Sequence, residues 1–112
     1  MANQFYYQII DNTLYYGANE WEGSTLMTPS TSAYMFNFDN SVLNLLPKDE
    51  SVVVLENVVK PIFYFNNSNL QTIDLTHFTI KGDFNLFYGS NSYSNSLNEI
   101  GLPDGIENCT FL

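Results

Sequence analysis

The sequence contains no arginine and three lysines against twelve acidic residues, which gives a formal net charge of −9. Direct binding to nucleic acid depends on clustered cations that neutralise phosphates, and binding to anionic membrane surfaces has the same requirement. Both kinds of direct partner are therefore excluded. Strong acidity favours a partner protein with a basic surface, or solubility alone, and the charge does not choose between these two.

Cysteine and histidine occur once each, as Cys109 and His77. One cysteine cannot form an intramolecular disulfide, so nothing indicates an oxidising compartment. One imidazole without partners at usable spacing supplies neither a metal site nor a base for nucleophilic catalysis, and we expect His77 to be a surface or turn residue. Cys109 lies near acids in the sequence, which disfavours a reactive thiolate.

Paired carboxylates are the remaining catalytic candidates, because glycosidases use such pairs. Several pairs occur, but they lie in segments expected to be turns: Asp49 with Glu50, Glu20 with Glu22, and Asp104 with Glu107. The sequence shows no EF-hand or nonapeptide calcium pattern and no phosphate-binding glycine-rich loop. We predict a protein that is not an enzyme, with no catalytic residue, cofactor site or metal site, while calcium bound by turn carboxylates stays an open alternative.

Long hydrophobic runs are absent, and the first residues lack a basic segment followed by an apolar stretch. These features predict neither a membrane span nor a secretory signal. We expect a cytoplasmic protein, located in the host cytoplasm if a phage encodes it.

What the sequence does contain is an internal repeat. Leu70 to Leu75 follows the pattern Leu-x-x-Ile-x-Leu, and Leu97 to Leu102 repeats it 27 residues later. Phenylalanines recur at intervals of 27, 24 and 24 residues, at Phe36, Phe63, Phe87 and Phe111. The last two apolar residues of the pattern are two apart, as one face of a strand requires, so each copy must bury that face against its neighbours. We expect a shared core of Leu70, Ile73, Leu75, Leu97, Ile100 and Leu102.

The segment from Ile62 to Phe78 combines an apolar-Phe pair, an Asn/Ser turn and the leucine pattern. It resembles the BspA-like leucine-rich repeats of bacterial surface proteins, and the resemblance extends over residues 33–112. Asn replaces the cysteine common in the turn of that family, and the first copy is degenerate. The resemblance implies a mainly β fold, a short leucine-rich-repeat solenoid of about three irregular repeats.

The N-terminal residues predict a β-hairpin. Phe5 to Ile10 and Thr13 to Tyr16 are rich in β-formers, and Asp11-Asn12 between them suits a tight turn with positive φ. We expect residues 1–17 to cap the solenoid, residues 18–32 to form a loop, and residues 1–112 to be a single domain. Inside the loop, Trp21 is either a plug over the core or an exposed contact.

Two further segments carry strand signals. The stretch from Val42 to Leu46 predicts a strand or a short helical turn before Pro47. The stretch from Ser51 to Val59 is strongly β-branched and predicts a strand.

Exposed positions on successive turns are the surface with which solenoids bind proteins. Acidic residues beside tyrosines suit a basic partner, with the tyrosines as anchors. The candidate protein-binding residues are Tyr64, Asp74, Thr76, Tyr88, Tyr93 and Glu99. The alternative is that these residues only solvate the solenoid.

Two hypotheses of function stay open. The first is a non-catalytic protein-protein interaction module, specifically a small acidic phage or mobile-element inhibitor (anti-CRISPR or anti-defence type) of a basic nucleic-acid-processing host protein. The second, favoured by the family resemblance, is a surface adhesion or virion component built from leucine-rich repeats. An open C-terminal repeat would also allow a homo-oligomer.

Overall fold

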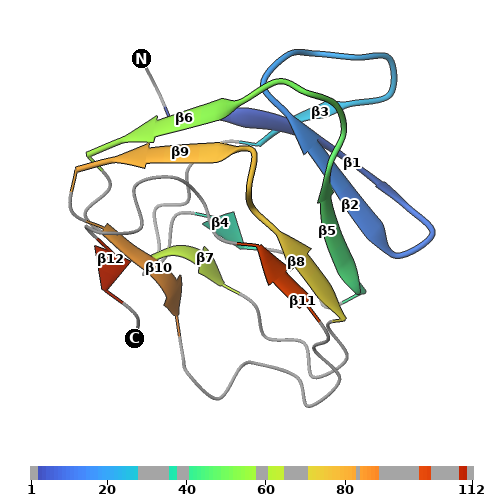
Figure 1. Cartoon of the computed structure of the whole chain (residues 1–112). Helices are drawn as coiled ribbons and strands as arrows, with labels where there is room; N and C mark the ends of the chain where they lie inside the picture. The colour runs from blue at the N-terminus through green and yellow to red at the C-terminus, as the bar shows by residue number, and fades with distance from the viewer. Residues whose placement is uncertain are drawn as a thin grey trace.

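The computed structural model describes residues 3–27, 36–37, 41–57, 61–64, 71–82, 84–88, 99–101 and 109–110. In this part the protein is mainly β, as predicted, with twelve strands and no helix (Figure 1). Among the described residues, accordingly, no helix has the length and apolar character needed to cross a membrane.

The strands form three sheets. The largest sheet contains β1 (Phe5–Ile10), β2 (Thr13–Gly17), β3 (Thr25–Met27), β5 (Asn44–Pro47), β8 (Thr72–Asp74) and β11 (Glu99–Gly101), in the order β11-β8-β5-β2-β1-β3. The second contains β4 (Phe36–Asn37), β7 (Pro61–Tyr64), β10 (Phe84–Tyr88) and β12 (Cys109–Thr110), in the order β12-β10-β7-β4. The third pairs β6 (Val53–Glu56) with β9 (Phe78–Lys81). Figure 1 shows the three sheets arranged around a common interior.

The predicted N-terminal hairpin is present. β1 and β2 pair antiparallel, with Ile9 opposite Leu14 and Ile10 opposite Thr13. Asp11 and Asn12 in the turn have φ angles of 50° and 66°, which short polar side chains tolerate better than most. The hairpin therefore has the turn that its sequence predicts.

Beyond the hairpin, the largest sheet grows by parallel pairing. β2 pairs with β5, β5 with β8, and β8 with β11, so Leu14, Leu45, Ile73 and Ile100 are successive register partners. Ile73 and Ile100 occupy the same place in the two copies of the leucine pattern. Backbone bonds continue this stacking between the strands, since Leu43 N–H donates to the Asn12 carbonyl and Gln71 N–H to the Leu43 carbonyl, both at 2.8 Å.

The buried residues whose side chains the structure describes come from the six-stranded and two-stranded sheets and the segments beside them. The apolar ones, which form the core, are Phe5, Leu14, Tyr16, Val42, Leu45, Val53, Leu55, Ile73, Leu75, Phe78 and Ile80. Phe78 stacks on Tyr16 with ring centroids 4.5 Å apart and meets Phe5 edge-on at 5.3 Å. The predicted burial of Ile73 and Leu75 is confirmed, whereas Leu70, Leu97 and Leu102 lie outside the described residues.

Two segments differ from expectation. The stretch 18–32, expected to be a loop, contains β3, which pairs antiparallel with β1 from Phe5–Met27 to Tyr7–Thr25. The free edge of β1 supplies the partner that the local sequence does not reveal. The predicted strand from Ser51 to Val59 is shorter and ends at Glu56, because Asn57 has a φ of 54°. The alternatives left open for Val42 to Leu46 resolve to a strand over Asn44–Pro47.

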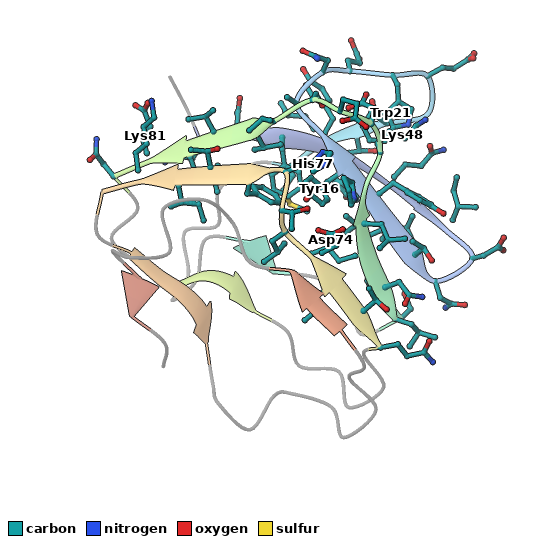
Figure 2. All side chains as sticks on the ribbon, in the orientation of Figure 1. Tyr16, Trp21, Lys48, Asp74, His77 and Lys81 are labelled. Atoms are coloured by element: carbon teal, nitrogen blue, oxygen red, sulfur yellow. The ribbon has the colours of Figure 1, made fainter. Side chains whose placement is uncertain are left out.

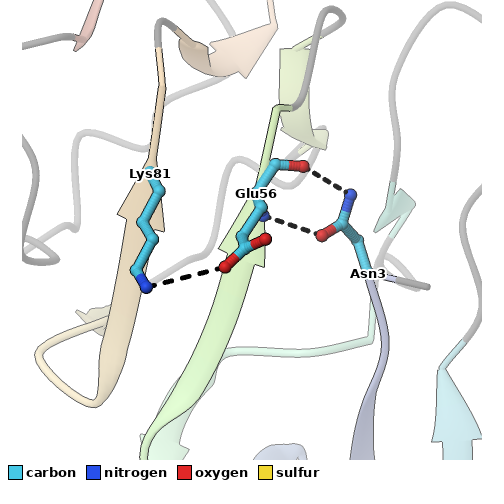
Figure 3. Close-up of polar contacts among 3 residues, drawn as sticks. All are labelled: Asn3, Glu56 and Lys81. Carbon is cyan, nitrogen blue, oxygen red and sulfur yellow. Dashed lines mark hydrogen bonds and ion pairs between the residues drawn. The ribbon is translucent and has the colours of Figure 1, made fainter. Parts of the chain in front are cut away.

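The outer edge of β6 is closed by a side chain (Figure 3). Asn3 Nδ2 donates to the Glu56 carbonyl at 3.0 Å, and Glu56 N–H donates to Asn3 Oδ1 at 2.8 Å. On the other side, Lys81 of β9 pairs with the Glu56 carboxylate at 3.6 Å. The Asn3 amide thus takes the place of a neighbouring strand's peptide group, which satisfies an edge that would otherwise face solvent.

Candidate functional site

The six predicted binding residues fall on different sheets. Asp74 ends β8 and Glu99 begins β11 in the six-stranded sheet, and Thr76 lies in the turn after β8. Tyr64 and Tyr88 are register partners in the four-stranded sheet, on β7 and β10. Tyr93 lies outside the described residues. The structure therefore brings the two acids together in one sheet and the two tyrosines together in another.

Asp74 and Glu99 are close in register. Glu99 pairs with Thr72, and Asp74 pairs with Gly101 two residues further along the same two strands. Because side chains alternate along a strand, positions two apart belong to the same face. The two acids thus lie diagonally, two register positions apart, on neighbouring strands, and their positions belong to the same face of the sheet.

Thr76 is occupied by a local role. Its N–H and its hydroxyl both donate to Asp74 Oδ1, at 3.0 and 2.6 Å. Ser51 and Asp49 form the same arrangement in the preceding corner, with bonds of 2.8 and 2.5 Å. The hydrogen bonds from the Ser51 hydroxyl and N–H lower the pKa of Asp49 below its ordinary value. Thr76 is therefore a turn-forming residue, and its hydroxyl already has a partner.

The outward side of the six-stranded sheet follows from the alternation of buried residues. Leu14 and Tyr16 of β2 are buried, so the alternating residues Thr13 and Tyr15 face away from the core. Tyr15 pairs with Gln8 on β1 and with Leu46 on β5. We call this surface the outer face; its residues are Gln8, Ile10, Thr13, Tyr15, Leu46, Thr72 and Asp74.

The segment after β2 folds back onto the outer face. Trp21 Nε1 donates to Gln8 Oε1 at 2.9 Å, and the indole lies so close to Gly17 that a Cβ there would come within 3.3 Å of the ring. Lys48 Nζ lies over the ring, 5.7 Å from its centroid, which is within cation–π range. Figure 2 shows Trp21 and Lys48 together at one end of the sheet. Trp21 is half-buried on the outer face and does not plug the core.

Local hydrogen bonds between Trp21 and Ser24 hold the conformation of the segment after β2. Trp21 N–H donates to Ser24 Oγ at 3.0 Å, and Ser24 N–H and Oγ both donate to the Trp21 carbonyl. Gly23 has a φ of 92°, and a Cβ there would come within 2.6 Å of Gln8 Nε2. The positive φ favours glycine at this position, and a larger residue would also displace the end of the Gln8 side chain. The result is a rigid placement of the indole beside Gln8.

A recess of about 270 Å³ opens beside Trp21 on the outer face. Its lining residues are Gln8, Ile10, Tyr15 and Lys48. Ile10 is 47% exposed, so its apolar surface is accessible from the recess. Ile10 and Tyr15 supply apolar surface, and Gln8 and Lys48 supply an amide and an ammonium group. Small binding sites typically combine apolar walls with a few polar groups in this way.

His77 and Tyr16 meet behind this face. His77 N–H donates to the buried Tyr16 hydroxyl at 3.1 Å (both residues are labelled in Figure 2). Burial raises the pKa of the Tyr16 phenol far above its ordinary value, opposed by the bond from His77 and supported by the charge of Asp74. His77 Nδ1 is buried without a hydrogen-bond partner in the described part of the chain. The expected turn position of His77 agrees with this geometry, and no three His, Cys, Asp or Glu residues among those described group as metal ligands would.

The sequence prediction of binding residues omitted Gln8, Tyr15 and Lys48, and it gave Trp21 only as an alternative, as an exposed contact or a plug over the core. Period-two alternation in the hairpin would have placed Gln8 and Tyr15 on the outward side once Leu14 and Tyr16 were assigned to the core. No local signal indicates that Trp21 and Lys48 meet, because the contact depends on the path of residues 18–24 over the sheet.

No protein-family model matches the chain, and no curated protein or solved structure is significantly similar to it. The resemblance of residues 33–112 to BspA-like repeats thus stays a prediction from the sequence pattern.

Proposed function

We propose that the chain is a short leucine-rich-repeat solenoid of the BspA-like kind, in which the hairpin of residues 1–17 caps repeats formed by residues 33–112. Parallel register supports this proposal, since Leu45, Ile73 and Ile100 align on three successive strands. Phe36 and Phe87 both align with Phe63 in the four-stranded sheet. Each pair of neighbouring strands thus lies roughly one sequence period apart, as stacking of repeats requires.

The proposed function is non-catalytic protein binding through the outer face. The observation that carries it is a recess lined by Tyr15, with Trp21 in contact with two other lining residues, Gln8 and Lys48. This recess lies on the sheet that also contains Asp74 and Glu99. Partly buried Trp and Tyr side chains are typical anchors of protein interfaces, because they bury large areas and lose little conformational entropy. The net charge of −9 favours a partner with a basic surface.

In this proposal the acidic and aromatic residues affect different rates of binding. Asp74 and Glu99 steer a basic partner toward the face and raise the association rate. Tyr15 and Trp21 hold the complex and set the dissociation rate. A basic nucleic-acid-processing protein of the host is the partner that fits this charge, and the chain then acts as a small cytoplasmic inhibitor of the anti-CRISPR or anti-defence type, encoded by a phage or mobile element.

The test is kinetic and uses a partner isolated from a host lysate. Association rates of wild type, Asp74→Asn and Glu99→Gln are measured at low and physiological ionic strength, between which the Debye length falls from roughly 30 to 8 Å. Each substitution should slow association several-fold at low salt and little at high salt. Glu56→Gln is the matched control, because it removes the same charge from the two-stranded sheet.

An association rate indifferent to salt and to both substitutions would contradict the steering role. The acidity would then serve solubility alone. The alternative hypothesis, a surface adhesion or virion component, is favoured by the family resemblance and would then be the better supported one.

A further inference from the structure

The recess beside Trp21 has hydrogen-bond donors to offer. Gln8 Oε1 already accepts from the Trp21 indole, whereas no hydrogen bond from the Gln8 amide nitrogen is seen in the described part of the chain, so the NH₂ group can donate to a ligand. Lys48 carries an ammonium group, which only donates. The Tyr15 hydroxyl can donate as well. Because all three groups can donate and Lys48 can only donate, the recess favours a ligand that presents acceptor oxygens.

Charge narrows the choice to an anionic acceptor. Lys81 forms an ion pair with Glu56, whereas in the described part of the chain no carboxylate lies within ion-pair distance of Lys48. Lys48 is exposed and lines the recess; its charge also acts on the neighbouring Asp49, but without an ion pair, so the ammonium group can still bind a ligand. An ammonium that is not paired with a carboxylate attracts one more strongly than a neutral carbonyl.

The apolar walls of the recess favour a ligand that has apolar surface next to its carboxylate. Ile10 and the ring of Tyr15 line it together with the two donors. A volume of about 270 Å³ suits one side chain with its backbone and not a large ligand. The ligand must thus combine a carboxylate and an apolar body in a single residue-sized unit.

We infer that the recess binds the C-terminal residue of a partner polypeptide, with its carboxylate at Lys48 and Gln8 and its apolar side chain against Ile10 and Tyr15. This inference rests on the proposed function and names the partner's contact at that site. A terminal residue is the unit that presents both groups at once, whereas Asp and Glu carry a carboxylate without an apolar branch.

The surrounding charge supports a single terminal carboxylate over an acidic segment. The exposed acids in the loops adjoining the recess are Asp11, Glu20, Glu22, Asp49 and Glu50. They repel further negative groups and attract cationic residues that precede the terminus. A basic polypeptide that ends in an apolar residue fits both the recess and its rim.

The experiment uses the full chain and two matched peptides, acetyl-glycyl-glycyl-leucine and its C-terminal amide. Binding is followed by the fluorescence and the indole N–H resonance of Trp21, the one tryptophan in the sequence. Acid-terminated peptide should bind with a Kd on the order of millimolar, as expected for a ligand of this size, and the amide about tenfold more weakly. Lys48→Met should abolish the difference, and Lys81→Met, the control, should preserve it.

Three outcomes overturn the inference: no binding of the acid peptide at a concentration of about ten times the expected Kd, equal binding of acid and amide, or an unchanged preference in a folded Lys48→Met variant.

A further experiment tests the source of the carboxylate. If 4-methylpentanoate binds as tightly as the peptide, the ligand is a free organic acid, and the assignment to a chain end is overturned. Thermal melts establish that each variant is folded. If the peptides fail while association with the whole partner still responds to Asp74→Asn, the recess assignment falls and the proposed function stands.

Discussion

Trp21 donates its indole N–H to Gln8 Oε1 across 13 residues of sequence, at 2.9 Å. This bond fixes the loop after β2 to the outer face of β1 and sets the position of both groups beside the recess. The bond also occupies one of the two acceptor positions of Gln8 Oε1, so it affects both the shape of the site and the groups that Gln8 presents to a ligand.

Replacing Gln8 with Leu should therefore destabilise the protein. The substitution preserves most of the side-chain volume but leaves the half-buried indole N–H without an acceptor, at a cost of about 1–2 kcal/mol. Urea unfolding of Gln8→Leu, Trp21→Phe and the double variant measures the coupling between the two residues. Additive free energies in this cycle would show that the bond contributes nothing.

Leu75 is fully buried and should be sensitive to truncation. Leu75→Ala should lower the free energy of unfolding by about 2–5 kcal/mol, because it removes buried methyl groups and leaves a cavity. Val54→Ala is the control; Val54 is 45% exposed on β6, and its truncation should cost about 0.5 kcal/mol or less. Similar melting temperatures for the two variants would contradict the assigned core.

Tyr16 should make stability fall at alkaline pH. Burial raises the pKa of its phenol above the ordinary value of 10.0, so above that pH the unfolded chain loses a proton that the folded protein retains. Because the unfolded state then binds fewer protons, the free energy of unfolding decreases as pH rises from about 10 upward.

Tyr16→Phe separates this effect from the packing of the ring. The variant should be about 1 kcal/mol less stable at neutral pH, since His77 N–H loses its acceptor. Its stability should decline less steeply above pH 10 than that of wild type. Parallel stability curves in alkaline solution would exclude Tyr16 as the responsible group.

Asp74 has a structural role that must be separated from its charge. Asp74→Ala removes the oxygen that accepts two bonds from Thr76 and should cost about 1–2 kcal/mol. Asp74→Asn retains an acceptor oxygen and should cost less than half as much. Chemical denaturation compares the two, and equal losses would mean that the negative charge itself stabilises the turn.

Most of what the sequence predicted correctly is local. The hairpin was identifiable because β-formers on both sides of Asp11-Asn12 and the φ tolerance of those two residues act within a few positions. Burial of Ile73 and Leu75 was identifiable because residues two apart on a strand share a face. These features need only the chain's own periodicity and turn chemistry.

Contacts between distant segments were decided by the tertiary structure alone. β3 exists because the edge of β1 offers hydrogen bonds to Thr25–Met27, a run too short to be a strand by itself. The predicted tyrosines Tyr64 and Tyr88 pair with each other in the four-stranded sheet, whereas Asp74 lies in the six-stranded sheet. The repeat pattern does not specify to which sheet each strand belongs.

By itself, then, the sequence determined the β-class of the described fold, the hairpin and the acidity of the molecule. The tertiary structure decided that Trp21, Gln8 and Lys48 form one cluster on the outer face, since a cation–π contact and a side-chain hydrogen bond require positions set by three separate strands and the path of a loop. Such contacts have no period along the chain, and the site that they create is visible only when the sheet is assembled.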